Sequence, residues 1–225
     1  MKKKLLALTL LTGLSNNVMA DVIGTYFGGD IWLSGVDGNL KYNSEEFNTS
    51  YEDTYNYRIY AKFEHPIPLI PNASLRFSNI DVEGSGSNEN INLKTMDYTL
   101  YYEFLDNSIV SLDAGITLRM LEGTYQDGGD KHDFDAPLPM GYLSAEVGLP
   151  LFPLKGFAMV NAIGLAGDTY SDAEIGVAYL INPGYVLDWS IRAGYRIQKL
   201  DLDDIDNVTA DATIDGAFVG FEGHF

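Results

Sequence analysis

The sequence predicts an all-β protein, a closed antiparallel up-and-down transmembrane β-barrel of ten strands. Three observations support this prediction. Apolar and polar residues alternate over stretches longer than the roughly 5–6 residues of an ordinary strand. The basic residues well inside these stretches all lie on the polar face, and short connections take turns with mostly longer, acidic ones. These features are typical of strands that face lipid on one side and a barrel interior on the other.

Residues 1–20 are predicted to be a secretory signal peptide that is removed from the mature protein. The segment starts with Lys2, Lys3 and Lys4, continues with an apolar run from Leu5 to Leu14, and ends on Ala20 after small residues. This order of basic, apolar and small residues is the signature of an export signal. The apolar run is too short to cross a bilayer as a helix. Residues 21–225 then form the barrel domain.

The charge of the mature chain excludes several classes of partner. Without residues 1–20, 11 Lys and Arg face 32 Asp and Glu, a net charge of −21. This balance argues against nucleic acid and against docking on an anionic membrane surface. The sequence has no cysteine, so an exported chain of this length must be stabilised without disulfides.

The clearest alternation is "YVLDWSIRAGYRIQ", residues 185–198, where a period of two persists for fourteen residues. A barrel strand that crosses a membrane needs about 9–11 residues. Similar stretches occur at 55–64, 96–104 and 110–120, each apolar and aromatic on one face and polar on the other.

Ten strands are expected at about 22–35, 55–65, 73–83, 93–105, 109–121, 138–149, 157–168, 172–182, 185–198 and 213–225. The alternative is eight strands, if 157–182 forms one strand and a loop. That region alternates poorly, since Asn161 shares a face with Phe157, Met159 and Ile163.

The connections between these strands are of two kinds. Short ones lie at 65–72, 105–108, 149–156 and 182–184, and acidic ones at 37–54, 84–92, 122–136 and 200–212. The connection near 166–172 is the exception, because it lies at the same end of the barrel as the acidic connections but must be tight. Short periplasmic turns and longer outer loops are the arrangement of an outer-membrane barrel.

The polar faces predict a lumen filled with charge. An arginine or lysine on the lipid face near the midplane costs about 2–4 kcal/mol, so the basic residues should point inward. A barrel of this size has little interior room beyond its side chains. We therefore expect the inward charges to pair and fill the lumen, and a narrow polar pore is the alternative. The predicted lumen residues are Arg58, Lys62, Glu64, Arg76, Asp97, Glu103, Asp113, Arg119, Glu146, Asp188, Arg192, Arg196 and Glu222.

The chain ends "GAFVGFEGHF", with an aromatic residue in the last position. This end resembles the last strand of outer-membrane barrels, whose terminal aromatic residue is read by the barrel-assembly machinery. Val219, Phe221 and Phe225 match that pattern, which makes them the expected assembly signal. Gly223 departs from it, because an aromatic or large apolar residue is common two places before the end.

Three segments, "DVIGTYFGGDIW", "EHPIPLIPN" and "YRIQKLDLDDIDNVTADATIDGAFVGFEGHF", together resemble a family of small, largely uncharacterised outer-membrane β-barrel proteins of Gram-negative bacteria. The resemblance covers most of the mature chain and is strongest at both ends. It implies the fold and a location in the outer membrane. It implies no activity and transfers no functional residues.

The histidines offer the only hint of catalysis. They are His65, His132 and His224, and His132 lies in an acidic stretch with Asp130, Asp133 and Asp135. A general base needs a histidine held close to a carboxylate, and some ten-stranded barrels are proteases with Asp and His at the outer rim. Lipid-modifying barrels use sets of Ser, His and an acid, but no serine here has a distinctive spacing.

The acidic stretch "DLDDIDNVTAD" contains Asp201, Asp203, Asp204 and Asp206, oxygen ligands of the kind that calcium prefers. It lacks the glycine and glutamate of an EF-hand loop. We expect at most a loose association of the acidic loops with divalent ions shared with lipopolysaccharide phosphates. No catalytic residue, metal site or cofactor is predicted.

The sequence thus favours a non-enzymatic, monomeric outer-membrane protein with a structural or surface-interaction role. Its expected partners are outer-membrane lipid and lipopolysaccharide, and the barrel-assembly machinery during insertion. The alternatives are a narrow pore, an outer-membrane protease or lipid-modifying enzyme, and a soluble lipocalin-like binding protein. The last predicts the reverse facing, with Leu187, Trp189 and Ile191 pointing inward.

Overall fold

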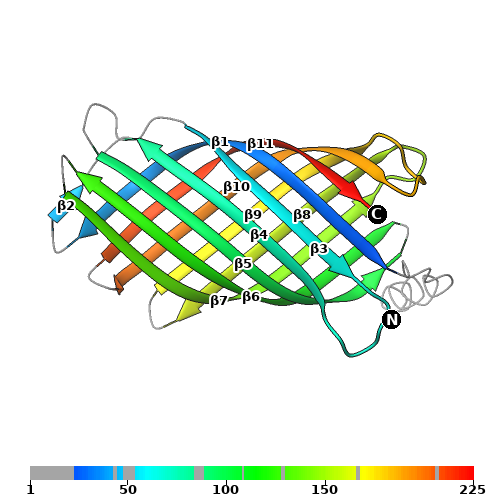
Figure 1. The fold of residues 1–225 in the computed structure, drawn as a ribbon, viewed down its shortest axis with the longest axis horizontal. Helices are drawn as coiled ribbons and strands as arrows, with labels where there is room; N and C mark the ends of the chain where they lie inside the picture. The colour runs from blue at the N-terminus through cyan, green and yellow to red at the C-terminus, as the bar shows by residue number, and fades with distance from the viewer. Residues whose placement is uncertain are drawn as a thin grey trace, which may run out of the picture.

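The computed structural model describes residues 23–42, 45–47, 54–83, 89–107, 109–127, 130–165, 168–205 and 208–225, and side chains for most of them. The predicted signal peptide, residues 1–20, lies outside the described residues. The described chain is all β, and its strands form one closed antiparallel sheet (Figure 1). The strands are β1 (Gly24–Tyr42), β2 (Glu45–Phe47), β3 (Thr54–Glu64), β4 (Asn72–Glu83), β5 (Glu89–Asp106), β6 (Val110–Asp127), β7 (Asp130–Gly148), β8 (Leu154–Leu165), β9 (Asp168–Leu180), β10 (Asp188–Ile205) and β11 (Val208–His224).

Ten of these strands form the barrel. β1 pairs with β3 on one side and with β11 on the other, from Tyr26 opposite His224 to Tyr42 opposite Val208. β2 is a three-residue strand that pairs with the end of β1. The predicted closed barrel of ten strands is confirmed, and the alternative of eight is wrong because β8 and β9 are two paired strands.

The two ends of the barrel differ, and we name them by the chain termini. The terminal rim carries Gly24, His224 and the connections at 65–71, 107–109, 149–153 and 181–187. The distal rim carries the other hairpin ends. Figure 1 shows the start of β1 and the end of β11 at the terminal rim.

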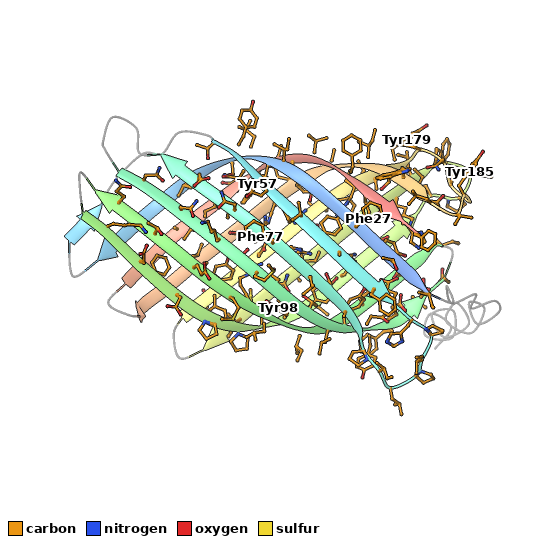
Figure 2. The ribbon with its side chains drawn as sticks, viewed as in Figure 1. Phe27, Tyr57, Phe77, Tyr98, Tyr179 and Tyr185 are labelled. Atoms are coloured by element: carbon orange, nitrogen blue, oxygen red, sulfur yellow. The ribbon has the colours of Figure 1, made fainter. Side chains whose placement is uncertain are left out.

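The outward face of the barrel carries large apolar and aromatic side chains around its circumference (Figure 2). Trp189 and Ile191 point outward and are 37% and 39% exposed. The inward facing that a lipocalin-like protein requires for these two residues is therefore wrong. Exposed outward residues include Phe27, Ile31, Tyr57, Ile59, Leu75, Tyr98, Leu100, Leu112, Ile116, Leu118, Leu143, Ile175, Val177, Tyr179, Tyr195, Val219 and Phe221.

The strands extend well beyond their predicted distal ends. The expected loops 122–136 and 200–212 are wrong, because β6 continues to Asp127, β7 begins at Asp130, β10 continues to Ile205 and β11 begins at Val208. Backbone pairing does not depend on an apolar outward face, so a ladder can continue where that face becomes polar. In β10 the apolar residues change sides there, since Leu200 is buried inside while Asp201 is exposed.

The ladder between β7 and β8 stops early. β7 pairs with β6 along its whole length, but its described pairing with β8 ends at Gly141 opposite Ala162. Two places further, the register would set Pro139 opposite Gly164. Proline has no N–H to donate, so it is found at edges and where a ladder ends. Pro137 and Pro139 are thus compatible with β7, because β6 is the only partner of this part of the strand among the described residues.

One predicted strand begins too early. Residues 185–187 lie in the turn before β10 and not in a strand. Side chains hold this turn, since Asn182 Nδ2 donates to the Leu187 carbonyl at 2.8 Å and Trp189 N–H donates to Asn182 Oδ1 at 2.8 Å. The alternation that predicts a strand at 185–198 therefore begins with three rim residues, 185–187, that lie outside the strand ladder.

The end of β11 closes the barrel. Phe225 and Thr25 exchange two backbone hydrogen bonds of 2.8 and 2.9 Å across the seam with β1. Gly223, which departs from the expected assembly pattern, lies opposite Phe27. A Cβ at Gly223 would lie 2.6 Å from the Phe27 ring. Phe27 therefore occupies the surface where an aromatic residue at 223 would lie, and its ring meets Trp189 edge to face at 5.5 Å.

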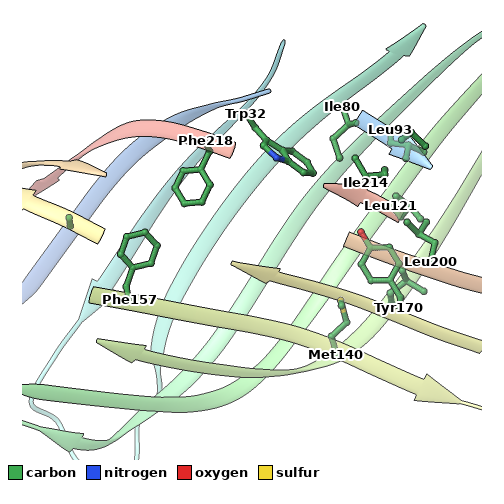
Figure 3. Packing of buried hydrophobic residues seen from close by; sticks show 13 residues of the cluster. Trp32, Ile80, Leu93, Leu121, Met140, Phe157, Tyr170, Leu200, Ile214 and Phe218 are labelled. Carbon is green, nitrogen blue, oxygen red and sulfur yellow. The ribbon is translucent and has the colours of Figure 1, made fainter. Parts of the chain in front are cut away.

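The interior is not filled by charge alone. Buried apolar side chains cluster inside the barrel (Figure 3). On β6, Leu121 follows Arg119 toward the distal rim, and on β10, Leu200 follows Arg196. We call the distal part of this cluster the apolar layer. It comprises Ile80, Leu93, Leu121, Leu138, Leu200 and Ile214.

Candidate functional site: the barrel lumen

The lumen charges that meet inside the barrel form two groups. Along β10, Arg192, Arg196 and Leu200 follow one another from the terminal rim toward the distal rim, all on the inward face. Arg192 belongs to the group nearer the terminal rim and Arg196 to the group beneath the apolar layer. Every second residue of a strand points inward, so successive inward residues lie at successive heights in the lumen.

The deeper group is centred on Arg119, which is 0% exposed. Arg119 binds Asp97 on the neighbouring strand with two hydrogen bonds of 2.6 Å, one from Nε and one from Nη2. Its Nη2 also donates to Asp172 Oδ2 at 2.6 Å, and its Nη1 donates to the Tyr170 hydroxyl at 2.7 Å. Arg196 reaches the same Asp172 carboxylate with bonds of 2.9 and 2.8 Å. Two arginines and two aspartates thus join β5, β6, β9 and β10 across the interior.

The group nearer the terminal rim is built around Glu174. Arg58 donates to Glu174 and to Asp30 Oδ2, and Arg192 Nη2 donates to Glu174 at 3.2 Å. Arg192 lies 3.9 Å from Glu222, which also accepts a 2.8 Å hydrogen bond from the Tyr60 hydroxyl. Buried charges of this kind need partners, because removing one leaves an uncompensated charge in a medium of low dielectric constant.

Aromatic rings and glycines support the arginines. The Arg192 guanidinium lies 4.3 Å from the centre of the Phe157 ring, and Arg58 lies 5.5 Å from that of Phe218. Gly176 lies opposite Phe157 and Gly194 opposite Phe218. A Cβ at either glycine would come within 2.8 Å of the facing ring. The glycines therefore give these rings room to lie against the wall beneath the cations.

Two predicted lumen cations lie apart from these ion pairs. Among the described residues, neither Arg76 nor Lys62 has a carboxylate oxygen within 4.0 Å. Arg76 Nη1 contacts Met159 Sδ at 3.6 Å, and Lys62 Nζ lies 5.8 Å from the centre of the Tyr26 ring.

The remaining predicted lumen residues lie near the terminal rim. A cavity of about 430 Å³, which we call the vestibule, is lined there by Glu64, Glu103, Asp113 and Glu146 together with Lys62 and Lys155. Glu64 accepts a 2.7 Å hydrogen bond from the Tyr101 hydroxyl, and Glu146 lies 3.6 Å from Lys155. Asp188 lies at the rim, where its Oδ1 accepts a 3.0 Å hydrogen bond from the N–H of Tyr185.

Sequence reasoning missed three acidic partners, Asp30, Asp172 and Glu174. All three are buried, and each is bound by a lumen arginine. Asp172 and Glu174 share one face with Tyr170 and Ala178 in β9, so period two was a usable signal. It was obscured because these acids follow directly on a stretch that resembles a polar turn.

Two of the three histidines, His65 and His224, have described side chains, and both lie at the terminal rim. His65 Nδ1 accepts a 3.2 Å hydrogen bond from Ile67 N–H in a rim turn, and His224 stacks on Tyr26 with ring centres 4.2 Å apart. The side chain of His132 lies outside the described residues, as do those of Asp203, Asp204 and Asp206. No group of three or more His, Cys, Asp or Glu able to hold a metal ion occurs among the side chains that the structure describes.

No protein-family model matches the sequence, and a search of curated proteins finds no relative. Within the described residues, no helix has the length and apolar character needed to span a membrane.

The chain is similar in structure to several solved β-barrels. Neisserial surface protein A is 13% identical, with 88% of this chain and 95% of that chain covered and a TM-score of 0.44. The attachment invasion locus protein Ail of Yersinia pestis, in complex with a heparin analogue, is 13% identical over 90% and 99%, with a TM-score of 0.39. The outer membrane protease OmpT of Escherichia coli is 10% identical over 92% and 96%, with a TM-score of 0.47. With identities of 13% or less and TM-scores below 0.5, these likenesses say nothing about the role or the location of this chain.

Proposed function

We propose that this chain is an integral protein of the Gram-negative outer membrane, with a structural or surface-interaction role and a lumen that is closed to solutes. The observation that carries the proposal is the Arg119 group, which joins opposite walls of the barrel directly beneath the apolar layer. A solute would have to break buried ion pairs and then enter packed apolar side chains, and both steps are costly.

The outward surface supports a membrane location. On β6 the outward residues are apolar from Leu112 to Met120, and the next one is the exposed Glu122. From Phe225, directly after β11, back to Ala217 they carry no charge, and the next one along β11 is Asp215. Both bands are nine residues long, close to the roughly 9–11 residues of a membrane-crossing strand. The terminal rim then lies in the periplasm.

The distal hairpins support the surface role. β6 and β7, and β10 and β11, continue as paired strands beyond the apolar band. Their exposed residues include Glu122, Asp133, Asp135, Asp201 and Asp211. We propose that these hairpins face the medium, beside the lipopolysaccharide of the outer leaflet, and that the chain is a monomer inserted by the barrel-assembly machinery.

Two measurements test this proposal. First, the unboiled protein from an outer-membrane fraction should migrate faster on a gel than the boiled protein, because a closed barrel resists detergent. Second, the purified barrel should give no discrete conductance steps in a planar bilayer, whereas a porin inserted under the same conditions gives them. Discrete steps would replace the closed lumen by the narrow pore. Recovery in the soluble periplasmic extract would remove the membrane assignment.

A further inference from the structure

A small cavity lies inside the barrel next to the Glu174 group. Its volume is about 20 Å³, and four cations line it against two carboxylates. A site of about 10–15 Å³ by this measure already admits one water-sized particle. The cations are Arg58, Lys62, Arg76 and Arg192, and the carboxylates are Glu146 and Glu174.

Arg76 is the cation whose own contacts satisfy it least. Its Nη1 has only the 3.6 Å contact with Met159 Sδ, a weak acceptor, and its Nε is buried with no hydrogen-bond partner among the described residues. Asp97 lies directly opposite on β5, but both of its oxygens are bound by Arg119. Arg76 as a whole is half-buried, and leaving its buried Nε–H without an acceptor costs free energy.

The other carboxylates near the cavity are already shared. Glu174 receives both Arg58 and Arg192, and Glu146 is 3.6 Å from Lys155. Lys62, like Arg76, has no carboxylate within 4.0 Å among the residues with described side chains. The lining therefore carries more positive than negative charge around a space for a single small particle. Asp30 and Glu222, outside the lining, compensate Arg58 and Arg192. A water molecule in this space would therefore leave Arg76 and Lys62 as the two cations without a close carboxylate.

We propose that this cavity binds one small monovalent inorganic anion of the chloride class, held by Arg76 and Lys62. The guanidinium of Arg76 supplies directed N–H donors, and the ammonium group of Lys62 supplies a second positive charge. The small volume excludes polyatomic organic anions. Tyr142 and Ser144 also line the cavity, and each carries a hydroxyl group, a type of group that can donate to an anion.

The cavity communicates with the terminal rim. Lys62 and Glu146 line both the small cavity and the vestibule, so the two spaces adjoin. An anion can therefore enter from the terminal side and need not pass the Arg119 group. Binding of an ion at this site requires no passage through the barrel, so the site is independent of whether the barrel conducts.

Chloride binding to the purified barrel in detergent would test this site. The ³⁵Cl resonance should broaden saturably on addition of protein, and replacing gluconate by chloride at constant ionic strength should raise the Tm, since a ligand that binds only the folded state stabilises it. Arg76→Gln should raise the Kd for chloride about tenfold or more, which corresponds to one lost charge-assisted contact. The matched control Lys131→Gln removes an exposed cation and should leave both signals unchanged.

A second variant separates binding from folding. Glu146→Gln removes a negative charge from the lining and should lower the Kd for chloride, an effect that damage to the fold would not produce. Equal Tm values in gluconate and chloride, with no saturable broadening, would overturn the proposal. It would equally fail if Arg76→Gln folded and kept the wild-type Kd, or if Glu146→Gln folded and weakened binding. A bromide-soaked crystal would show an anomalous peak beside Arg76 if the site is correct.

Discussion

Arg119 on β6 and Asp172 on β9 meet across the interior at 2.6 Å, although 53 residues separate them in the chain. Neither side chain is exposed, and both have a second ionic partner, Asp97 for Arg119 and Arg196 for Asp172. This contact ties together strands that are not neighbours in the sheet. It therefore fixes the shape of the lumen in a way that backbone pairing does not.

Arg119→Met should destabilise the barrel by about 3–5 kcal/mol, because it leaves Asp97 and Asp172 with too little positive charge in a buried site. The free energy of unfolding in urea, measured in detergent micelles, provides the number. Lys131→Met is the matched control, since Lys131 pairs with Asp133 at 3.0 Å but is 60% exposed. Exposed pairs contribute about 0–1 kcal/mol. Equal losses in the two variants would contradict a special role for the lumen group.

The two tryptophans report the facing of the strands. Trp32 lies inside at 2% exposure and Trp189 outside at 37%. In bilayers of brominated lipid, Trp32→Phe should retain strong fluorescence quenching, because its remaining Trp189 touches acyl chains. Trp189→Phe should lose most of it. The opposite result would mean that the apolar faces point inward.

An aromatic side chain at position 223 should be tolerated only when Phe27 is replaced by a smaller residue. Gly223→Phe alone should destabilise the barrel by about 1–3 kcal/mol, as overpacking does, because the Phe27 ring occupies the space. Phe27→Ala combined with Gly223→Phe should recover most of this loss. The free energies of unfolding of the single and double variants give the coupling energy between positions 27 and 223. Simple additivity would show that the two residues do not share one place on the surface.

The backbone of Phe225 should contribute to the stability of the folded barrel, and its ring should contribute to insertion. Deleting it removes both seam hydrogen bonds with Thr25, whereas Phe225→Ala keeps them and removes only the exposed ring. We expect both changes to reduce insertion by the assembly machinery, and only the deletion to weaken the folded barrel markedly. Heat-modifiable gel bands from outer membranes and unfolding of refolded protein report these two effects. Normal insertion of both variants would remove Val219, Phe221 and Phe225 as the proposed assembly signal.

The sequence by itself determined the fold class, the ten barrel strands and the inward facing of Arg58, Arg119, Arg192 and Arg196. The alternation of side chains between the two faces is a local property of each strand. An arginine, which avoids the lipid face, can therefore be assigned to the inward face without knowing which residues it contacts. The same reasoning could not locate the distal strand ends, because the outward face becomes polar at residues such as Glu122 while backbone pairing continues to Asp127.

Only the tertiary structure decided which charges meet. The strand register sets Arg119 opposite Asp97, but closure of the barrel brings Asp172 to the same guanidinium from three strands away. It also decided that Phe27 fills the place left by Gly223, and that Arg76 remains without a carboxylate while Arg58 gains two. These outcomes depend on distances across the lumen and the seam, which no local pattern in a single strand contains.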